Sequence, residues 1–189
     1  KSRMESQLDD RIIQEHRLEI MTHGRAVFRR VVNNTDRAIG TRLSGELSQL
    51  HGQGLFKGNI QYRMTGVAGQ SMGAYLVDGI ELRLKGIAND YVGKGMNGGL
   101  ITIRLDKQVR DRRKNMTIIG NTGLYGATGG RIHIAGRAGE RFAVRNSGAT
   151  AVVEGIGNHG CEYMTRGTII VLDSIGQNFG AGMTGGIAF

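Results

Sequence analysis

The chain has 189 residues, 39% of them apolar, and its 25 lysines and arginines exceed its 16 acidic residues to give a formal net charge of +9. This size suits one or at most two domains, and no apolar run is long enough to span a membrane as a helix. The single cysteine, Cys161, excludes a disulfide scaffold and fits a reducing compartment, so we expect a cytoplasmic protein.

Glycine is unusually common, with 32 residues, and proline is absent. Because the glycines recur in phase with short β-branched runs, they indicate ordered turns rather than disorder. The chain does not begin with methionine, and Phe189 lies inside a strand-like run. We therefore expect a piece of a longer chain, and an open strand edge at Phe189 would permit a homo-oligomer.

Residues 1–55 predict a helical lead-in and cap. The segment Ser6-Gln7-Leu8-Asp9 has the form of a capping box, and residues 27–33 have the composition of a strand.

A second helix is predicted within residues 34–52. The cluster Asn34-Thr35-Asp36 resembles an N-cap, and His51-Gly52 supplies a C-terminal stop. Between them one apolar stripe recurs at helical spacing, through Ile39, Leu43, Leu47 and Leu50. We expect this helix to cover exposed strand edges at one end of the molecule.

Residues 56–189 contain a repeat with a period of about 19 residues. Glycine-rich blocks such as Gly182-Met183-Thr184-Gly185-Gly186 each precede a β-like run, and the runs read IELRL, LITIR, RIHIA, ATAVV, TIIVL and IAF. The last glycines of the blocks stand at 79, 99, 130, 148, 167 and 186. The one long step contains the charged insert 104–115, which we expect to be a surface loop of open role.

A repeat of this length is too short for a strand and a crossover helix, but it can hold two or three short strands with tight turns. The sequence therefore predicts an all-β solenoid of about 19-residue coils, a parallel β-helix. Four asparagines in similar coil phase predict a partial ladder: Asn89, Asn121, Asn158 and Asn178.

Motifs for phosphate binding are not supported by the pattern. A dinucleotide fingerprint needs a strand before it and a helix after it, whereas these glycine motifs repeat between strands. Gly93-Lys94 lacks the glycine spacing and the following Ser or Thr of a Walker loop. We interpret the glycines as turn residues.

The segment Asn158-His159-Gly160-Cys161-Glu162 is a candidate for metal or thiol chemistry. A zinc site would need further ligands, for which His133 on a neighbouring coil is one candidate, and a cysteine nucleophile would need a histidine base within reach. The alternative is a buried reduced cysteine beside a turn histidine, which we favour; the sequence leaves open whether His159 and Cys161 have a chemical role.

Charged residues within the repeats have two interpretations. Asp90, Glu140, Arg141 and Arg145 could form ion pairs between coils or face a partner domain. The net positive charge permits nucleic-acid binding, but the cations are not interleaved with aromatic residues as in single-strand binders. We expect a basic soluble surface and no nucleic acid.

Several long motifs resemble the C-terminal Gly-rich domain of the glutamate synthase large (alpha) subunit. They include GNTGLYGATGG at 120–130, AGERFAVRNSG at 138–148 and NFGAGMTGG at 178–186. The resemblance covers roughly residues 34–189. The chain departs from it in the insert 104–115 and at Gly123 and Gly160, where relatives often have cysteine.

The resemblance implies a single-stranded right-handed parallel β-helix over 56–189, joined with the helical cap 1–55 in one structural domain. In that family the whole enzyme converts glutamine and 2-oxoglutarate to two glutamates. An amidotransferase domain releases ammonia, and a companion domain with FMN and an iron–sulfur cluster uses it. The β-helix domain braces both, so we expect no catalytic, cofactor-binding or metal residue in this chain.

The sequence thus favours a non-catalytic scaffold of glutamate synthase, which serves glutamate biosynthesis and ammonia assimilation. The alternatives are a basic nucleic-acid-binding module, an enzyme that uses Cys161 and His159, and a β-helix subunit of a related complex such as formylmethanofuran dehydrogenase. The sequence leaves open whether the chain is a fragment or a separate subunit, what its oligomeric state is, and which electron donor the full enzyme uses.

Overall fold

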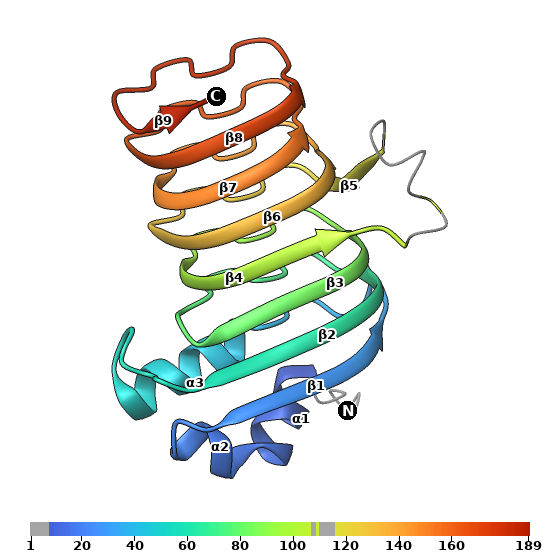
Figure 1. The fold of residues 1–189 in the computed structure, drawn as a ribbon, viewed down its shortest axis with the longest axis vertical. Coiled ribbons are helices and arrows are strands. Elements are labelled where there is room, and N and C mark those ends of the chain that lie inside the picture. The colour runs from blue at the N-terminus through green and yellow to red at the C-terminus, as the bar shows by residue number, and fades with distance from the viewer. Residues whose placement is uncertain (1–7, 107–108, 110–115) are drawn as a thin grey trace, which may run out of the picture.

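The computed structural model describes residues 8–106, 109 and 116–189. In this part of the chain nine strands form one parallel sheet (Figure 1). The strands are β1 (Arg25–Val32), β2 (Asn59–Ala68), β3 (Ile80–Ala88), β4 (Asn97–Arg104), β5 (Thr117–Ile119), β6 (Gly129–Ala138), β7 (Ser147–Gly155), β8 (Arg166–Ser174) and β9 (Ile187–Ala188).

Helices gather at the N-terminal end of the sheet (Figure 1). They are α1 (Leu8–Glu15), α2 (Arg17–Met21) and α3 (Thr41–His51). None of the helices within the described ranges is long and apolar enough to cross a membrane.

The strands follow one another across the sheet in chain order, with the short β5 off the main path. Their inward-facing side chains stack in register, as the period-2 pattern requires. One such row is completely buried and consists of Tyr62, Leu82, Ile101, Ile132, Ala151 and Ile169. The prediction that successive β-like runs pair in parallel is confirmed.

The connections pass behind the sheet (Figure 1) and have an unusual backbone. In six of them three alternate residues are left-handed, with φ between 54° and 71°. These triplets are Ser71, Gly73 and Tyr75; Tyr91, Gly93 and Gly95; Thr122, Leu124 and Gly126; Arg141, Ala143 and Arg145; His159, Cys161 and Tyr163; Asn178, Gly180 and Gly182. We call this arrangement the left-handed ladder.

Hydrogen bonds between neighbouring repeats stabilise the left-handed ladder. The amide of Tyr91 donates forward to the carbonyl of Asn121 at 2.9 Å, and that of Gly93 donates back to Met72 at 2.9 Å. The amide of Gly95 again donates forward, to Tyr125 at 2.8 Å. A left-handed conformation costs a non-glycine residue about 1–2 kcal/mol, and these bonds satisfy backbone groups that burial would otherwise leave unpaired.

The fold class predicted from the sequence needs correction. We expected an all-β, right-handed parallel β-helix whose coils hold two or three short strands. The described residues instead form one parallel sheet, with a single main strand per repeat and three helices. The physical reason lies in the left-handed residues, because alternate positive φ angles are incompatible with a second strand in each connection.

Asp9 of α1 closes the N-terminal end of the left-handed ladder. The middle residue of each triplet donates its amide to the preceding repeat, and Gly40 has the equivalent place at the end where no repeat precedes it. Its amide donates instead to Asp9 Oδ1 at 2.9 Å. The other oxygen of Asp9 accepts from the amides of Arg42 at 2.9 Å and Leu43 at 3.3 Å, so it also caps α3. The hydroxyl of Tyr62 on β2 donates to Asp9 Oδ1 at 3.0 Å. One carboxylate thus joins α1, α3 and the sheet.

The predicted helix within 34–52 exists, but its start was assigned wrongly. Asp36 closes a local turn by accepting from the amide of Asn33 at 2.8 Å, and α3 begins after Gly40. Gly52 is the C-cap as predicted. The apolar stripe is buried except for Leu50, which is 45% exposed.

Other N-terminal predictions have mixed outcomes. The expected strand at 27–33 is β1, and Asp9 belongs to α1. Ser6 and Gln7 of the expected capping box lie outside the described residues, as do 107–108 and 110–115 of the charged insert. The division at residue 55 stays a prediction.

Candidate functional site

The predicted cluster around His159 does not assemble into a metal site. His159 Nδ1 lies 2.7 Å from Glu162 Oε1, within one turn of the left-handed ladder. His133 lies on β6, in register with Val152 and exposed on the outer face of the sheet. Within residues 8–106, 109 and 116–189, no three His, Cys, Asp or Glu side chains are placed to hold a metal ion.

Cys161 is fully buried between repeats. Its backbone is left-handed, and its amide donates to the carbonyl of Phe142 at 2.8 Å. Burial raises the pKa of the Cys161 thiol to about 12, so the nucleophilic thiolate is scarce near neutral pH. The buried side chain of Cys161 therefore suits packing in the core rather than chemistry.

The charged residues of the repeats hold neighbouring connections together. Asp90 Oδ1 accepts from the amide of Asn121 at 2.8 Å, and Glu140 Oε1 accepts from Asn158 Nδ2 at 3.1 Å. Arg141 and Arg145 are exposed. No ion pair joins these charged side chains in the described structure, so that alternative was wrong.

The predicted asparagine ladder exists in part, through backbone amides. Asn121 Oδ1 accepts from the amide of Glu140 at 2.9 Å, and Asn158 Oδ1 accepts from that of Gln177 at 2.9 Å. Asn89 donates to Asn34 at 2.6 Å. Asparagine, aspartate and glutamate side chains thus share the role of hydrogen-bonding one connection to the next.

Aromatic and basic side chains meet at two points on the connections. Lys94 Nζ lies 5.4 Å from the ring centre of Tyr91, and Arg145 Cζ lies 5.9 Å from that of Tyr163. These are two separate contacts, and the expectation that the positive charge is not arranged on an aromatic-bearing platform stays a prediction.

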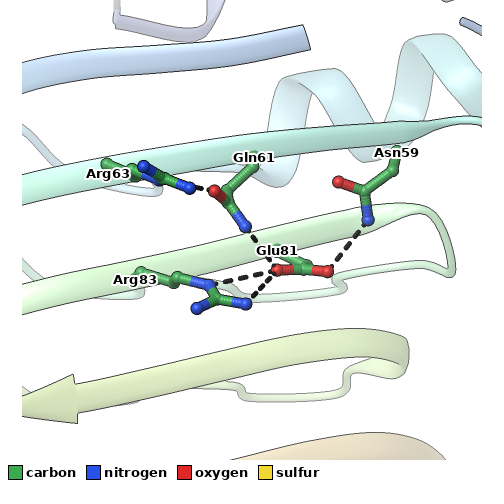
Figure 2. A network of polar contacts seen from close by, with 5 residues as sticks. All are labelled: Asn59, Gln61, Arg63, Glu81 and Arg83. Carbon is green, nitrogen blue, oxygen red and sulfur yellow. Dashed lines mark hydrogen bonds and ion pairs between the residues drawn. The ribbon is translucent and has the colours of Figure 1, made fainter. Parts of the chain in front are cut away.

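A polar network on the outer face of the sheet was not predicted. Glu81 on β3 accepts hydrogen bonds from Asn59 Nδ2 at 3.0 Å and Gln61 Nε2 at 2.6 Å, both on β2. Arg83 binds the same carboxylate through Nε at 3.1 Å and Nη2 at 2.8 Å. Figure 2 shows the side chains of both strands converging on Glu81, and Arg63 Nε extends the network to Gln61 Oε1 at 2.6 Å.

The network keeps Glu81 ionised. Partial burial raises the pKa of Glu81, but hydrogen bonds from Arg83, Gln61 and Asn59, together with the charge of Arg83, outweigh it and lower the pKa below the ordinary value. A carboxylate is thus held by a ready set of donors on this face.

A sequence signal for this network was present. Gln61 and Arg63 alternate on β2 just as Glu81 and Arg83 alternate on β3, twenty residues later. Both pairs lie within the strands and not in the glycine blocks that define the repeat. The strand register places the two pairs side by side. Comparison of outward-facing positions one repeat apart would have found it.

The chain is similar to known proteins over most of its length. A family model described as the GXGXG motif matches residues 9–189. A ferredoxin-dependent glutamate synthase 2 of Synechocystis is 58% identical over 156 residues, which cover 82% of this chain and 10% of the relative.

Two further relatives have different printed names. The NADPH glutamate synthase large chain of Bacillus subtilis is 52% identical over 159 residues, 84% of this chain and 10% of the relative. The NADH glutamate synthase of Schizosaccharomyces pombe is 47% identical over 188 residues, 99% of this chain and 9% of the relative. The chain therefore spans about a tenth of the length of the curated relatives it matches.

Proposed function

The chain belongs to the GXGXG motif family, and we propose that it is a non-catalytic scaffold segment of a glutamate synthase. The whole enzyme would make two glutamates from glutamine and 2-oxoglutarate. This segment would brace its amidotransferase domain and its FMN synthase domain.

One observation carries the proposal: the side chains that first suggested chemistry are used to hold repeats together. Glu140 and Asp90 join neighbouring connections, and Cys161 packs in the core. The left-handed ladder uses the backbone of six described connections in the same way. Such a stack gives a stiff body, which suits a brace between domains.

The relatives support a role apart from electron delivery. Their printed names specify ferredoxin, NADPH or NADH, yet they remain similar to this chain. A segment that chose the electron donor would be expected to differ among them. We place FMN and the iron–sulfur cluster in the companion domain, and the assembly in the cytoplasm.

The test is to assay the full-length protein that contains this chain. The substitutions His159→Ala, Glu162→Gln and Cys161→Ala should leave glutamine-dependent glutamate formation per folded molecule within about twofold of the unchanged protein. A loss of about a hundredfold in kcat with an intact fold, measured by circular dichroism, would place catalytic chemistry here and overturn the proposal.

A further inference from the structure

Basic residues stand directly opposite one another on the outer face of the sheet. The strand register pairs Arg29 of β1 with Arg63 of β2, and Arg63 with Arg83 of β3. All three are exposed. Like charges at directly opposed positions destabilise a sheet, so sheet stability does not account for this row.

The same face carries a second opposed pair. Lys85 of β3 lies opposite Arg104 of β4. Lys85 is neutralised by Asp106, whose Oδ2 lies 2.6 Å from Lys85 Nζ. We call the row Arg29, Arg63 and Arg83, together with Lys85, the basic sheet face.

The carboxylates on this face neutralise only some of its charge. Glu81 pairs with Arg83 at 2.8 Å. Arg63 donates to the neutral amide of Gln61, and neither Arg29 nor Arg63 has a carboxylate partner within residues 8–106, 109 and 116–189. Two adjacent guanidinium groups therefore remain uncompensated and open to solvent.

The chemistry of a suitable ligand is visible in the network around Glu81 (Figure 2). There a carboxylate takes a two-point hydrogen bond from one arginine and single bonds from two side-chain amides. Guanidinium groups match carboxylates in geometry as well as charge. Arg63 and Arg29 offer further guanidinium groups one and two strands away from Glu81.

We propose that the basic sheet face binds a carboxylate-rich surface of a companion domain, a more specific inference that rests on the proposed scaffold function. Charge complementarity identifies the occupant. A protein is favoured over a nucleic acid because the outward positions of β1–β4 carry no aromatic ring for base stacking. The exposed tyrosines Tyr75, Tyr91 and Tyr163 belong to the connections.

The test is zero-length carbodiimide cross-linking of the full-length protein, or of the complex that holds this chain, followed by peptide mass spectrometry. Lys85 should cross-link to aspartate or glutamate residues outside the GXGXG segment. The Lys85–Asp106 product is an internal control, since the two groups are in contact within this chain.

Matched variants sharpen the result. Arg29→Gln with Arg63→Gln should lower the yield of the interdomain product about fivefold or more. Arg141→Gln with Arg145→Gln removes the same charge from the connections and should leave it unchanged. The Lys85–Asp106 product should persist in both variants, which shows that the sheet remains folded.

Three results would overturn the proposal. Interdomain products from Lys94 but not from Lys85 would mean that companion domains dock elsewhere, and the scaffold function would stand without this surface. Binding of single-stranded RNA that depends on Arg29 and Arg63, with no interdomain product at Lys85, would assign the face to nucleic acid. If no companion domain purifies with the chain, both the scaffold function and this surface are wrong.

Discussion

Asp9 shows how one side chain can complete several elements. Its two oxygens accept four hydrogen bonds while the side chain is almost fully buried. Burial raises the pKa of Asp9, and the hydrogen bonds from Gly40, Tyr62, Leu43 and Arg42 oppose this effect without cancelling it. Loss of the carboxylate would remove the acceptor that three backbone amides and the Tyr62 hydroxyl now share.

We expect Asp9→Asn to lower the free energy of unfolding by about 2 kcal/mol, because the amide nitrogen cannot accept the bonds that one carboxylate oxygen now takes. Urea unfolding measures the change. Asp10→Asn is the matched control, because Asp10 forms an ion pair with the half-exposed Arg42 at 2.7 Å and its loss should cost less than about 1 kcal/mol. Equal effects would contradict the capping role of Asp9.

Glu81 gives a pH-dependent prediction. Its pKa is lower in the folded chain than the ordinary value of 4.5, so its ionised form stabilises the fold above that value, and the contribution is lost as the pH falls through the folded pKa. Glu81→Gln should therefore cost about 1 kcal/mol near pH 7 and progressively less below about pH 4.5. Urea unfolding of the unchanged protein and of Glu81→Gln across this pH range is the measurement. A difference in stability that does not change with pH would contradict the stabilising role of the ionised Glu81.

Cys161 gives a reactivity prediction. With a pKa of about 12, about one thiol in ten thousand is ionised at pH 8, and burial blocks access as well. A thiol-specific disulfide reagent should react only on unfolding. Cys161→Ala should fold, because Ala143 occupies the same left-handed position one repeat earlier. Rapid modification of the native protein would refute the packing role.

At the scale of elements, the left-handed ladder is the feature that sequence patterns conceal. Glycine occupies six of the eighteen left-handed positions in the triplets, and the other twelve hold residues such as Leu124 and Arg141. Non-glycine residues rarely adopt this conformation, and here the bonds between repeats impose it. Local propensity therefore could not reveal it.

The strain in the ladder can be measured at Thr122, a β-branched residue with φ of 59°. Thr122→Gly should raise the free energy of unfolding by about 1 kcal/mol, since glycine adopts this conformation without steric cost. Thr150→Gly on strand β7 should lower it by about 1 kcal/mol. Thermal unfolding of both variants measures these changes. Destabilisation by Thr122→Gly would mean that the ladder stores little strain.

Strand positions were predictable because each run follows a glycine block and is rich in β-branched or other apolar residues, and IELRL, LITIR and RIHIA also alternate in polarity. The six runs after the glycine blocks became strands β3, β4, β6, β7, β8 and β9. The short β5 was missed, because three residues after a charged insert carry no period. The start of α3 was missed because its cap, Asp9, comes from a separate helix.

At the scale of the whole molecule, the repeat and the parallel pairing were predictable and the fold class was not. Counting residues per repeat could not show that each repeat contributes one main strand and a left-handed connection. The candidate surface depended on register as well: Arg29, Arg63 and Arg83 are 34 and 20 residues apart and become neighbours only through the sheet.

If this chain braces the catalytic domains of a glutamate synthase, it should be found in one assembly with them. The most direct test is the mass of the complex that the endogenous, untruncated protein forms in native extract, with identification of every copurifying sequence. We expect amidotransferase and FMN-containing synthase sequences, on the same chain or as partners. A lone small protein, or one that carries RNA or its own turnover, would contradict it.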